Sequence, residues 1–306
     1  MRLLRTALLL TLSTIPLVYS HSIYAETRIL ASIKPVELLV RAIATENMNT
    51  STLVPPGSSP HNYALTPSKR RALETADVIF WVGPDMETFL TRLLTGEEFG
   101  ERSVALMQSE TELSAPEEHT GDHRHDHHHD SEDDPHIWVD PDMALSMAET
   151  IRDTLASQDG ADKAALDRNL EAFRAAVARK EAQIRKQLEP LKNVSLFAYH
   201  SALTRFAEHY NLNVAGVLTL NPDRSPGARH IAGVQNSLRQ ANHPCLLTEP
   251  QFNRQWWRSI TEGLNVTFST WDPLATDIEV TANGYVDFQQ SIADAVLACL
   301  PENAEH

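Results

Sequence analysis

The sequence predicts an α/β protein made of two doubly wound lobes with mostly parallel sheets, joined by one long rigid helix. Two observations predict this fold. Short apolar runs alternate with helical patterns along both halves of the chain, and strands that alternate with helices form parallel sheets covered on both faces. Between the halves, one helical pattern continues without Gly or Pro for much longer than any other.

The first half is expected to hold four strands, each followed by a helix. Pro35 stands near the first turn of the first helix, where its missing N–H costs no hydrogen bond. The apolar runs predict strands at 28–33, 52–54, 78–82 and 104–107. The periodic segments predict helices at 35–44, 67–75, 86–94 and 141–156.

The longest helical pattern lies between residues 162 and 189. At 1.5 Å per residue it predicts a helix of about 42 Å. A coiled coil would show the same spacing, but a single short seam favours a strut packed across two lobes. The apolar positions that carry the pattern are Leu166, Leu170, Phe173, Val177, Ile184 and Leu188.

The second half repeats the rhythm of the first. Strands are expected at 194–199, 214–220, 245–248 and 266–270, and helices at 202–210, 230–240, 254–264 and 285–300. The predicted organisation is therefore a signal peptide at 1–25, an N-terminal lobe at 26–158, a linking helix at 159–190 and a C-terminal lobe at 191–306.

The N-terminus has the pattern of a secretory signal. Arg2 and Arg5 precede a largely apolar core from 7 to 18, and Ser20 or Ala25 is the expected cleavage position. No later segment approaches the roughly 20 apolar residues that a spanning helix needs. No cysteine stands near the cleavage position, so we expect an exported, soluble protein without a lipid anchor.

Charge and cysteine content narrow the functional classes. A formal net charge of −15 makes nucleic acid and anionic lipid poor partners. Cys245 and Cys299 are the only cysteines, and in an oxidising compartment we expect them to pair, with two unpaired buried thiols as the alternative. Their separation and the absence of a CxxC motif argue against redox chemistry.

A His- and acid-rich segment at 117–134 is the most unusual part of the chain. It contains eight Asp or Glu residues and has too few apolar groups to pack, so a mobile loop is expected. Imidazole suits zinc, copper and nickel, which favours weak capture of a transition metal over a merely solvated acidic run. Its six histidines are His119, His123, His125, His127, His128 and His129.

Four further residues are candidate ligands of a single tight metal site, because each follows or ends a predicted strand or precedes a helix. They are His61, His136, His200 and Asp272, two from each lobe. Ligands of open α/β sheets bind outside the carboxyl ends of the strands, which places this metal in the cleft between the lobes. Glu249 is expected to support a ligand or to replace one.

Three of the other histidines are expected to be structural or solvated. These are His209, within a helical pattern, His230, at the start of one, and His243, before a proline. Trp138 and Trp271 lie close in sequence to two candidate ligands, and shielding of the site and core packing are equally good explanations of them.

Several ordered motifs resemble the periplasmic zinc-binding proteins of ABC importers, over essentially the whole mature chain. They are VPPGSSPHNYALTPS, the His-rich segment, PHIWVDPDMA, LFAYHSALTRF, NPDRSPGARHI, TEPQF and STWDPLAT. The resemblance implies two lobes bridged by a rigid helix, a high-affinity metal in the cleft and delivery to a membrane permease. It also implies a monomeric receptor in the Gram-negative periplasm that is not an enzyme.

The resemblance implies roles for particular residues. The three histidine ligands of the family fall on His61, His136 and His200, and its C-terminal disulfide on the two cysteines. Some zinc-specific members have a Glu immediately before the first histidine, where this chain has Pro60. The fourth ligand is therefore Asp272, by resemblance to related manganese and zinc receptors, a water, or Glu249.

Other functions stay open at this point. A manganese receptor of the same family is the nearest competitor, although such sites use more carboxylate and three imidazoles favour zinc. A periplasmic zinc buffer or chaperone without a permease would look the same in sequence. A secreted zinc hydrolase with Glu249 as base is the remaining class, but the chain has no HExxH motif.

Overall fold

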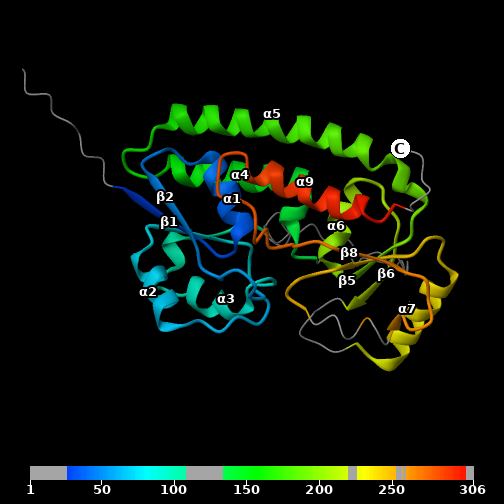
Figure 1. Cartoon of the computed structure of the whole chain (residues 1–306). Helices are drawn as coiled ribbons and strands as arrows, with labels where there is room; N and C mark the ends of the chain where they lie inside the picture. Colours follow the sequence, from blue (N-terminus) through cyan, green and yellow to red (C-terminus); the bar gives the residue numbers. More distant parts are fainter. Residues whose placement is uncertain (1–25, 108–133, 220–225, 253–256, 258–259, 301–306) are drawn as a thin grey trace, which may run out of the picture.

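The computed structural model describes residues 26–107, 134–219, 226–252, 257 and 260–300. Within these residues the chain forms two four-stranded sheets, with one long helix running above both (Figure 1). No helix among them is both long and apolar enough to span a membrane. The predicted signal peptide and almost all of the His-rich segment lie outside the described residues.

The N-terminal sheet is parallel throughout. Its order is β2-β1-β3-β4, and its strands are β1 (Thr27–Ala31), β2 (Met48–Thr52), β3 (Val78–Trp81) and β4 (Ser103–Ala105). The chain runs from β1 to β2 on one side of β1 and then returns to β3 on the other side. The loops that follow β1 and β3 therefore lead away in opposite directions at the carboxyl edge of the sheet. Such a switch point is where α/β sheets bind ligands.

The position of β2 differs from the prediction of a strand at 52–54. The strand begins at Met48 and has the polar sequence MNTST, in which every second residue is more exposed. An edge strand needs only one buried face, so its pattern is weaker than that of the central strands. The apolar Leu53 and Val54 instead follow the strand, where their N–H groups donate to the carbonyls of Ala31 and Ser32.

Helices cover both faces of this sheet, which confirms the doubly wound arrangement. One buried cluster joins Phe80 to α1 (Lys34–Ile43) and α4 (Pro141–Ala156). A second cluster joins Ile79 and Trp81, which point to the opposite face, to α2 (Pro67–Thr75) and α3 (Thr88–Leu94). Period-two alternation along β3 thus separates the two layers.

The C-terminal sheet has the same topology, in the order β6-β5-β7-β8, again parallel. Its strands are β5 (Leu196–His200), β6 (Val214–Thr219), β7 (Cys245–Thr248) and β8 (Thr267–Thr270), and its helices include α6 (Thr204–His209), α7 (Ala228–Gln240) and α9 (Gly284–Leu297). Of the helix expected at 254–264, Trp257 and Ile260 are helical and residues 261–264 form a turn or bend, while 254–256 and 258–259 lie outside the described residues. The disulfide between Cys245 and Cys299 ties β7 to the end of α9.

The linking helix α5 (Lys163–Gln187) is close to its prediction. The side chain of Asp162 caps it by accepting a hydrogen bond from the N–H of Ala165 at 3.0 Å. The helix does not stand alone, because α4 and α9 pack beneath it and α9 also contacts α1 (Figure 1). One continuous buried cluster therefore extends across both lobes and stiffens their junction.

The buried carboxyl of Glu87 holds together the loops at the switch point of the N-terminal sheet. Ser32, at the end of β1, donates its hydroxyl proton to Oε1, and the N–H of Gly83 donates to Oε2 at 3.0 Å. Complete burial raises the pKa of Glu87 to about 7 in spite of these hydrogen bonds.

Stability should therefore depend on pH through Glu87. Its carboxyl titrates near 4.5 when unfolded and near 7 when folded, so the folded protein binds the extra proton between these values. The free energy of unfolding falls as pH rises through this window, by about 3 kcal/mol at most. The lowered pKa values of His61 and His136 raise stability over part of the same window, so the effect of Glu87 is measured as a difference between two proteins. Urea unfolding at pH 5 and pH 8 should show that the wild type loses stability relative to Glu87→Gln as pH rises. Parallel pH profiles would contradict it.

Candidate metal centre

The imidazoles of His61, His136 and His200 converge on one point between the lobes. His61 lies in the loop between β2 and α2, His136 immediately precedes the short 3₁₀ turn Ile137–Val139 that leads into α4, and His200 is the last residue of β5. The Nε2 atom of His136 lies 3.3 Å from Nε2 of His61 and 3.1 Å from Nε2 of His200.

Carboxylates behind two of the rings fix their tautomers. The Nδ1–H of His136 donates to Asp134 Oδ1 at 2.5 Å, and the Nδ1–H of His200 donates to Glu249 Oε1 at 2.7 Å. An ionised carboxylate only accepts, so each Nδ1 carries the proton and each Nε2 presents a lone pair. Carboxylates orient the histidine ligands of zinc sites in the same way.

Two lone pairs that face each other cannot form a hydrogen bond. His136 and His200 both present Nε2 lone pairs, so the 3.1 Å between these two atoms calls for a cation between the rings. Nitrogens bound at 2.0–2.1 Å to a tetrahedral Zn²⁺ lie about 3.3 Å apart, which matches the 3.1 Å and 3.3 Å separations found here.

Burial favours the neutral form of His61 and His136, which is the form that binds metal. His136 and His200 are 1% and 2% exposed. Burial, with the neighbouring imidazoles adding to it, lowers the pKa of His61 to about 3. Burial also lowers the pKa of His136, against the opposing effect of Asp134.

The charge around the site favours a dication. Asp134 and Glu249 are both buried, and each keeps one carboxylate oxygen without a hydrogen-bond partner. The guanidinium of Arg205 donates to the backbone carbonyl of Asp134 and partly balances this charge. A divalent cation among the three imidazoles would offset what remains, since buried charge without compensation is costly.

Mostly apolar groups line the rest of the cavity. The indole of Trp138 lies 5.2 Å from the ring of His136 and donates its Nε1–H to the carbonyl of Pro273 at 2.8 Å. Trp138 therefore both packs in the core and shields the site. The other apolar residues at the cavity are Pro60, Met86, Phe252, Pro273 and Leu274, and the polar Ser59 and Gln251 also line it.

Asp272 does not join the converging imidazoles, and the geometry argues against its expected role as a ligand. Its Oδ1 accepts hydrogen bonds from the N–H of Leu274 at 2.9 Å and from Gln251 at 2.6 Å, and its Oδ2 accepts from the N–H of Thr276 at 2.8 Å. Asp272 instead shapes the loop after β8. Glu249 bonds the far side of the His200 ring, which is where one of its two predicted roles, the support of a ligand, would place it.

Asp134 is the functional residue that sequence reasoning missed, because it was assigned to the end of the acidic segment. The sequence did contain a signal, because Asp134 stands two residues before His136. From that position one carboxylate can accept hydrogen bonds from both the N–H and the Nδ1–H of His136. His230 is away from the site, as expected, and donates to the carbonyl of Val217 at 2.9 Å. The six histidines of the predicted secondary metal loop lie outside the described residues.

Comparison with known proteins agrees with this geometry. The family model of the zinc-uptake complex component A, periplasmic (ZnuA), matches residues 29–299. The chain belongs to the ZnuA family. Among its ZnuA relatives, the high-affinity zinc uptake system protein of Yersinia pestis is 33% identical over 292 residues, covering 90% of this chain and 92% of the relative. The corresponding protein of Haemophilus ducreyi is 31% identical, covering 91% and 94%.

Solved structures share the ZnuA fold. A crystal structure of ZnuA has a TM-score of 0.69 at 24% identity, covering 88% of this chain and 99% of that one. The periplasmic zinc-binding protein TroA of Treponema pallidum has a TM-score of 0.70 at 18% identity, covering 89% and 99%. These likenesses confirm the two-lobed architecture of parallel sheets.

Proposed function

We propose that this protein captures Zn²⁺ in the cleft between its lobes and delivers it to the membrane permease of an ABC importer. His61, His136 and His200 would bind the ion through Nε2, with a water in the fourth position. The observation that carries the proposal is the convergence of three Nε2 atoms at zinc-ligand spacing. The zinc-uptake names of the ZnuA relatives support the same cargo.

Zinc fits the donor set better than manganese does. The nearby carboxylates, Asp134 and Glu249, bond the far side of the rings and are not among the converging atoms. A site of three imidazoles without a carboxylate favours Zn²⁺, which is a softer ion than Mn²⁺ and comes later in the first transition series. The same geometry speaks against a hydrolase, because the Glu249 that would be its base bonds His200.

We further propose that the chain is exported to the periplasm by residues 1–25 and acts as a monomer without nucleic-acid partners. The lobes would span 26–158 and 191–306, on either side of a linker at 159–190. Deleting the gene tests the transport role: growth in a medium depleted of zinc by a chelator should fail and recover on adding zinc. Unchanged growth would favour a zinc buffer over an importer.

Glu249 offers a graded test of the site. Replacing it with Ala removes the acceptor for the Nδ1–H of His200 and should weaken zinc binding 10- to 100-fold. Glu249→Gln keeps an acceptor oxygen and should weaken binding less. Competition against a chromophoric zinc chelator measures both. Equal affinities for wild type and Glu249→Ala would show that Glu249 does not position the ligand.

A further inference from the structure

Gln251 lines the same cavity as the three imidazoles, and the proposed function gives its side chain no role. It lies in the segment that follows β7, which turns where the N–H of Phe252 donates to the carbonyl of Glu249 at 3.3 Å. The ring of Phe252 stacks on Tyr199 at 4.5 Å and lies 5.5 Å from the ring of His200. These contacts hold the segment against the cavity.

The side-chain amide of Gln251 has a fixed orientation. Its Nε2 lies 2.6 Å from Asp272 Oδ1. Because an ionised carboxylate only accepts hydrogen bonds, the nitrogen of the amide must be the atom that faces Asp272. The other arm of the amide, Oε1, is buried and has no hydrogen-bond partner among the described residues. Buried acceptors in native proteins nearly always have a donor, so this oxygen calls for one that the protein atoms do not supply.

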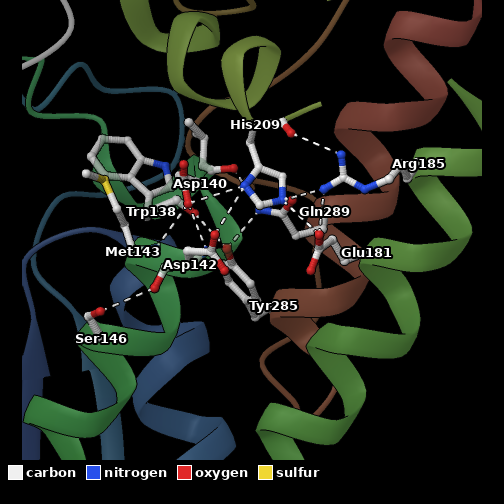
Figure 2. A network of polar contacts seen from close by, with 11 residues as sticks. Trp138, Asp140, Asp142, Met143, Ser146, Glu181, Arg185, His209, Tyr285 and Gln289 are labelled. Atoms are coloured by element: carbon white, nitrogen blue, oxygen red, sulfur yellow. Dashed lines mark hydrogen bonds and ion pairs between the residues drawn. The ribbon is translucent and has the colours of Figure 1, made fainter. Parts of the chain in front are cut away.

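The carboxylate that orients the amide is itself held in place. Asp272 accepts hydrogen bonds from two N–H groups of the loop that follows β8. The carbonyl of Pro273 in this loop accepts from the indole of Trp138 at 2.8 Å. Tyr285 in turn donates its hydroxyl proton to the backbone carbonyl of Trp138 at 3.0 Å (Figure 2). The support behind Gln251 is therefore anchored in both lobes.

The size of the cavity limits which donor can meet this oxygen. Its free volume is about 10 Å³, which is at the lower limit for one water molecule. Three imidazoles leave one position open on a tetrahedral Zn²⁺, and a water takes that position. A water bound to the ion through its oxygen keeps both protons for donation, so it can supply the missing hydrogen bond.

We propose that Gln251 Oε1 accepts a hydrogen bond from the water that completes the coordination of Zn²⁺ in the cleft, and that Asp272 is the positioning residue that orients the amide. This role rests on the proposed function, because it needs the ion at the three Nε2 atoms. Zinc in proteins is bound by Cys, His, Asp and Glu, so the amide oxygen is expected to bond the water and not the ion.

Crystals of the mature protein grown with one molar equivalent of Zn²⁺ test this contact at high resolution. We expect a water about 2.0–2.2 Å from the ion and about 2.8 Å from Gln251 Oε1. A water more than about 3.5 Å from Oε1, or a bond from Oε1 or Asp272 to the ion, would overturn this role alone. An ion found away from the three Nε2 atoms would overturn the proposed function and this role together.

A substitution tests the same contact in solution. Gln251→Met keeps the length of the side chain and removes the acceptor, so it should weaken the binding of Zn²⁺ about 2- to 10-fold, as loss of one neutral hydrogen bond does. Gln240→Met makes the same change at an exposed position at the end of α7 and should leave the affinity unchanged. Equal affinities for wild type and Gln251→Met, measured against a chromophoric chelator, would overturn the role of Gln251.

A double-variant cycle tests whether Asp272 acts through Gln251. Asp272→Asn should weaken the binding of Zn²⁺ in the wild type and weaken it much less in Gln251→Met, where no amide remains to be oriented. A purely structural effect of Asp272 on its loop would cost the same factor in both proteins. Equal losses in the two backgrounds would therefore overturn the positioning role.

Discussion

Replacing His200 with alanine will weaken the tight binding of Zn²⁺ by more than about 100-fold. Loss of a carboxylate that only supports a ligand costs 10- to 100-fold, and loss of the ligand itself costs more. The change also leaves Glu249 buried without its imidazole partner, which adds a penalty for uncompensated charge. Zinc titration in competition with a chelator of known affinity measures the effect.

A matched variant separates this loss from a general effect of removing histidine. His243 is exposed and has a backbone φ of 47°, a conformation that Asn tolerates. His243→Asn should bind Zn²⁺ as tightly as the wild type. If His200→Ala kept the tight component, or if both variants lost it equally, the assignment of His200 as a ligand would be wrong.

Removing the disulfide will cost about 4 kcal/mol of stability. Cys245 and Cys299 are 54 residues apart, and the chain-entropy model assigns about this value to closing such a loop in the unfolded state. Both side chains are buried, and the bond holds the end of α9 to the central strand β7. Since α9 packs against α1 and α5, its release would also loosen the junction between the lobes.

Urea unfolding of the double variant Cys245→Ala with Cys299→Ala tests this value. The protein should be free of zinc, because bound metal would add stability by mass action. Reducing the wild type with a thiol should produce the same loss as the double variant. A loss below about 1 kcal/mol in both cases would show that packing alone holds α9 in place.

Local patterns predicted most of the fold. The inner strands β3, β5 and β7 are mostly apolar and almost entirely buried, so their sequences mark them clearly. The edge strand β2 is polar on its exposed face. The apolar residues that follow it were taken for the strand, so the prediction began several residues too late in the sequence. The packing of α9 under α5 depends on contacts between distant segments, which periodicity does not encode.

Contacts between distant segments also decide which residues of the site could be predicted from the sequence and which could not. The sequence shows roughly where strands end and helices begin. These positions predicted that His61, His136 and His200 would lie together. Which carboxylate lies behind which ring depends on strand order. In the order β6-β5-β7-β8, Glu249 follows the strand next to that of His200, whereas Asp272 follows a strand one place further away. That order was not available from the sequence.

His209 shows the limit most clearly. Its place in a helical pattern says nothing about what lies opposite, and the expectation was a structural or solvated ring. The carboxylates that surround it come from α4 and α5, which reach it only through the packing of the linking layer. Tertiary contacts, not spacing along the chain, assemble this cluster.

The location of the first bound ion tests the central claim most directly. Crystals of the mature protein grown with one molar equivalent of Zn²⁺ should give, at the zinc edge, a main anomalous peak about 2.0–2.1 Å from the Nε2 atoms of His61, His136 and His200. A main peak anywhere else, or three rings that turn away from the ion, would contradict the account.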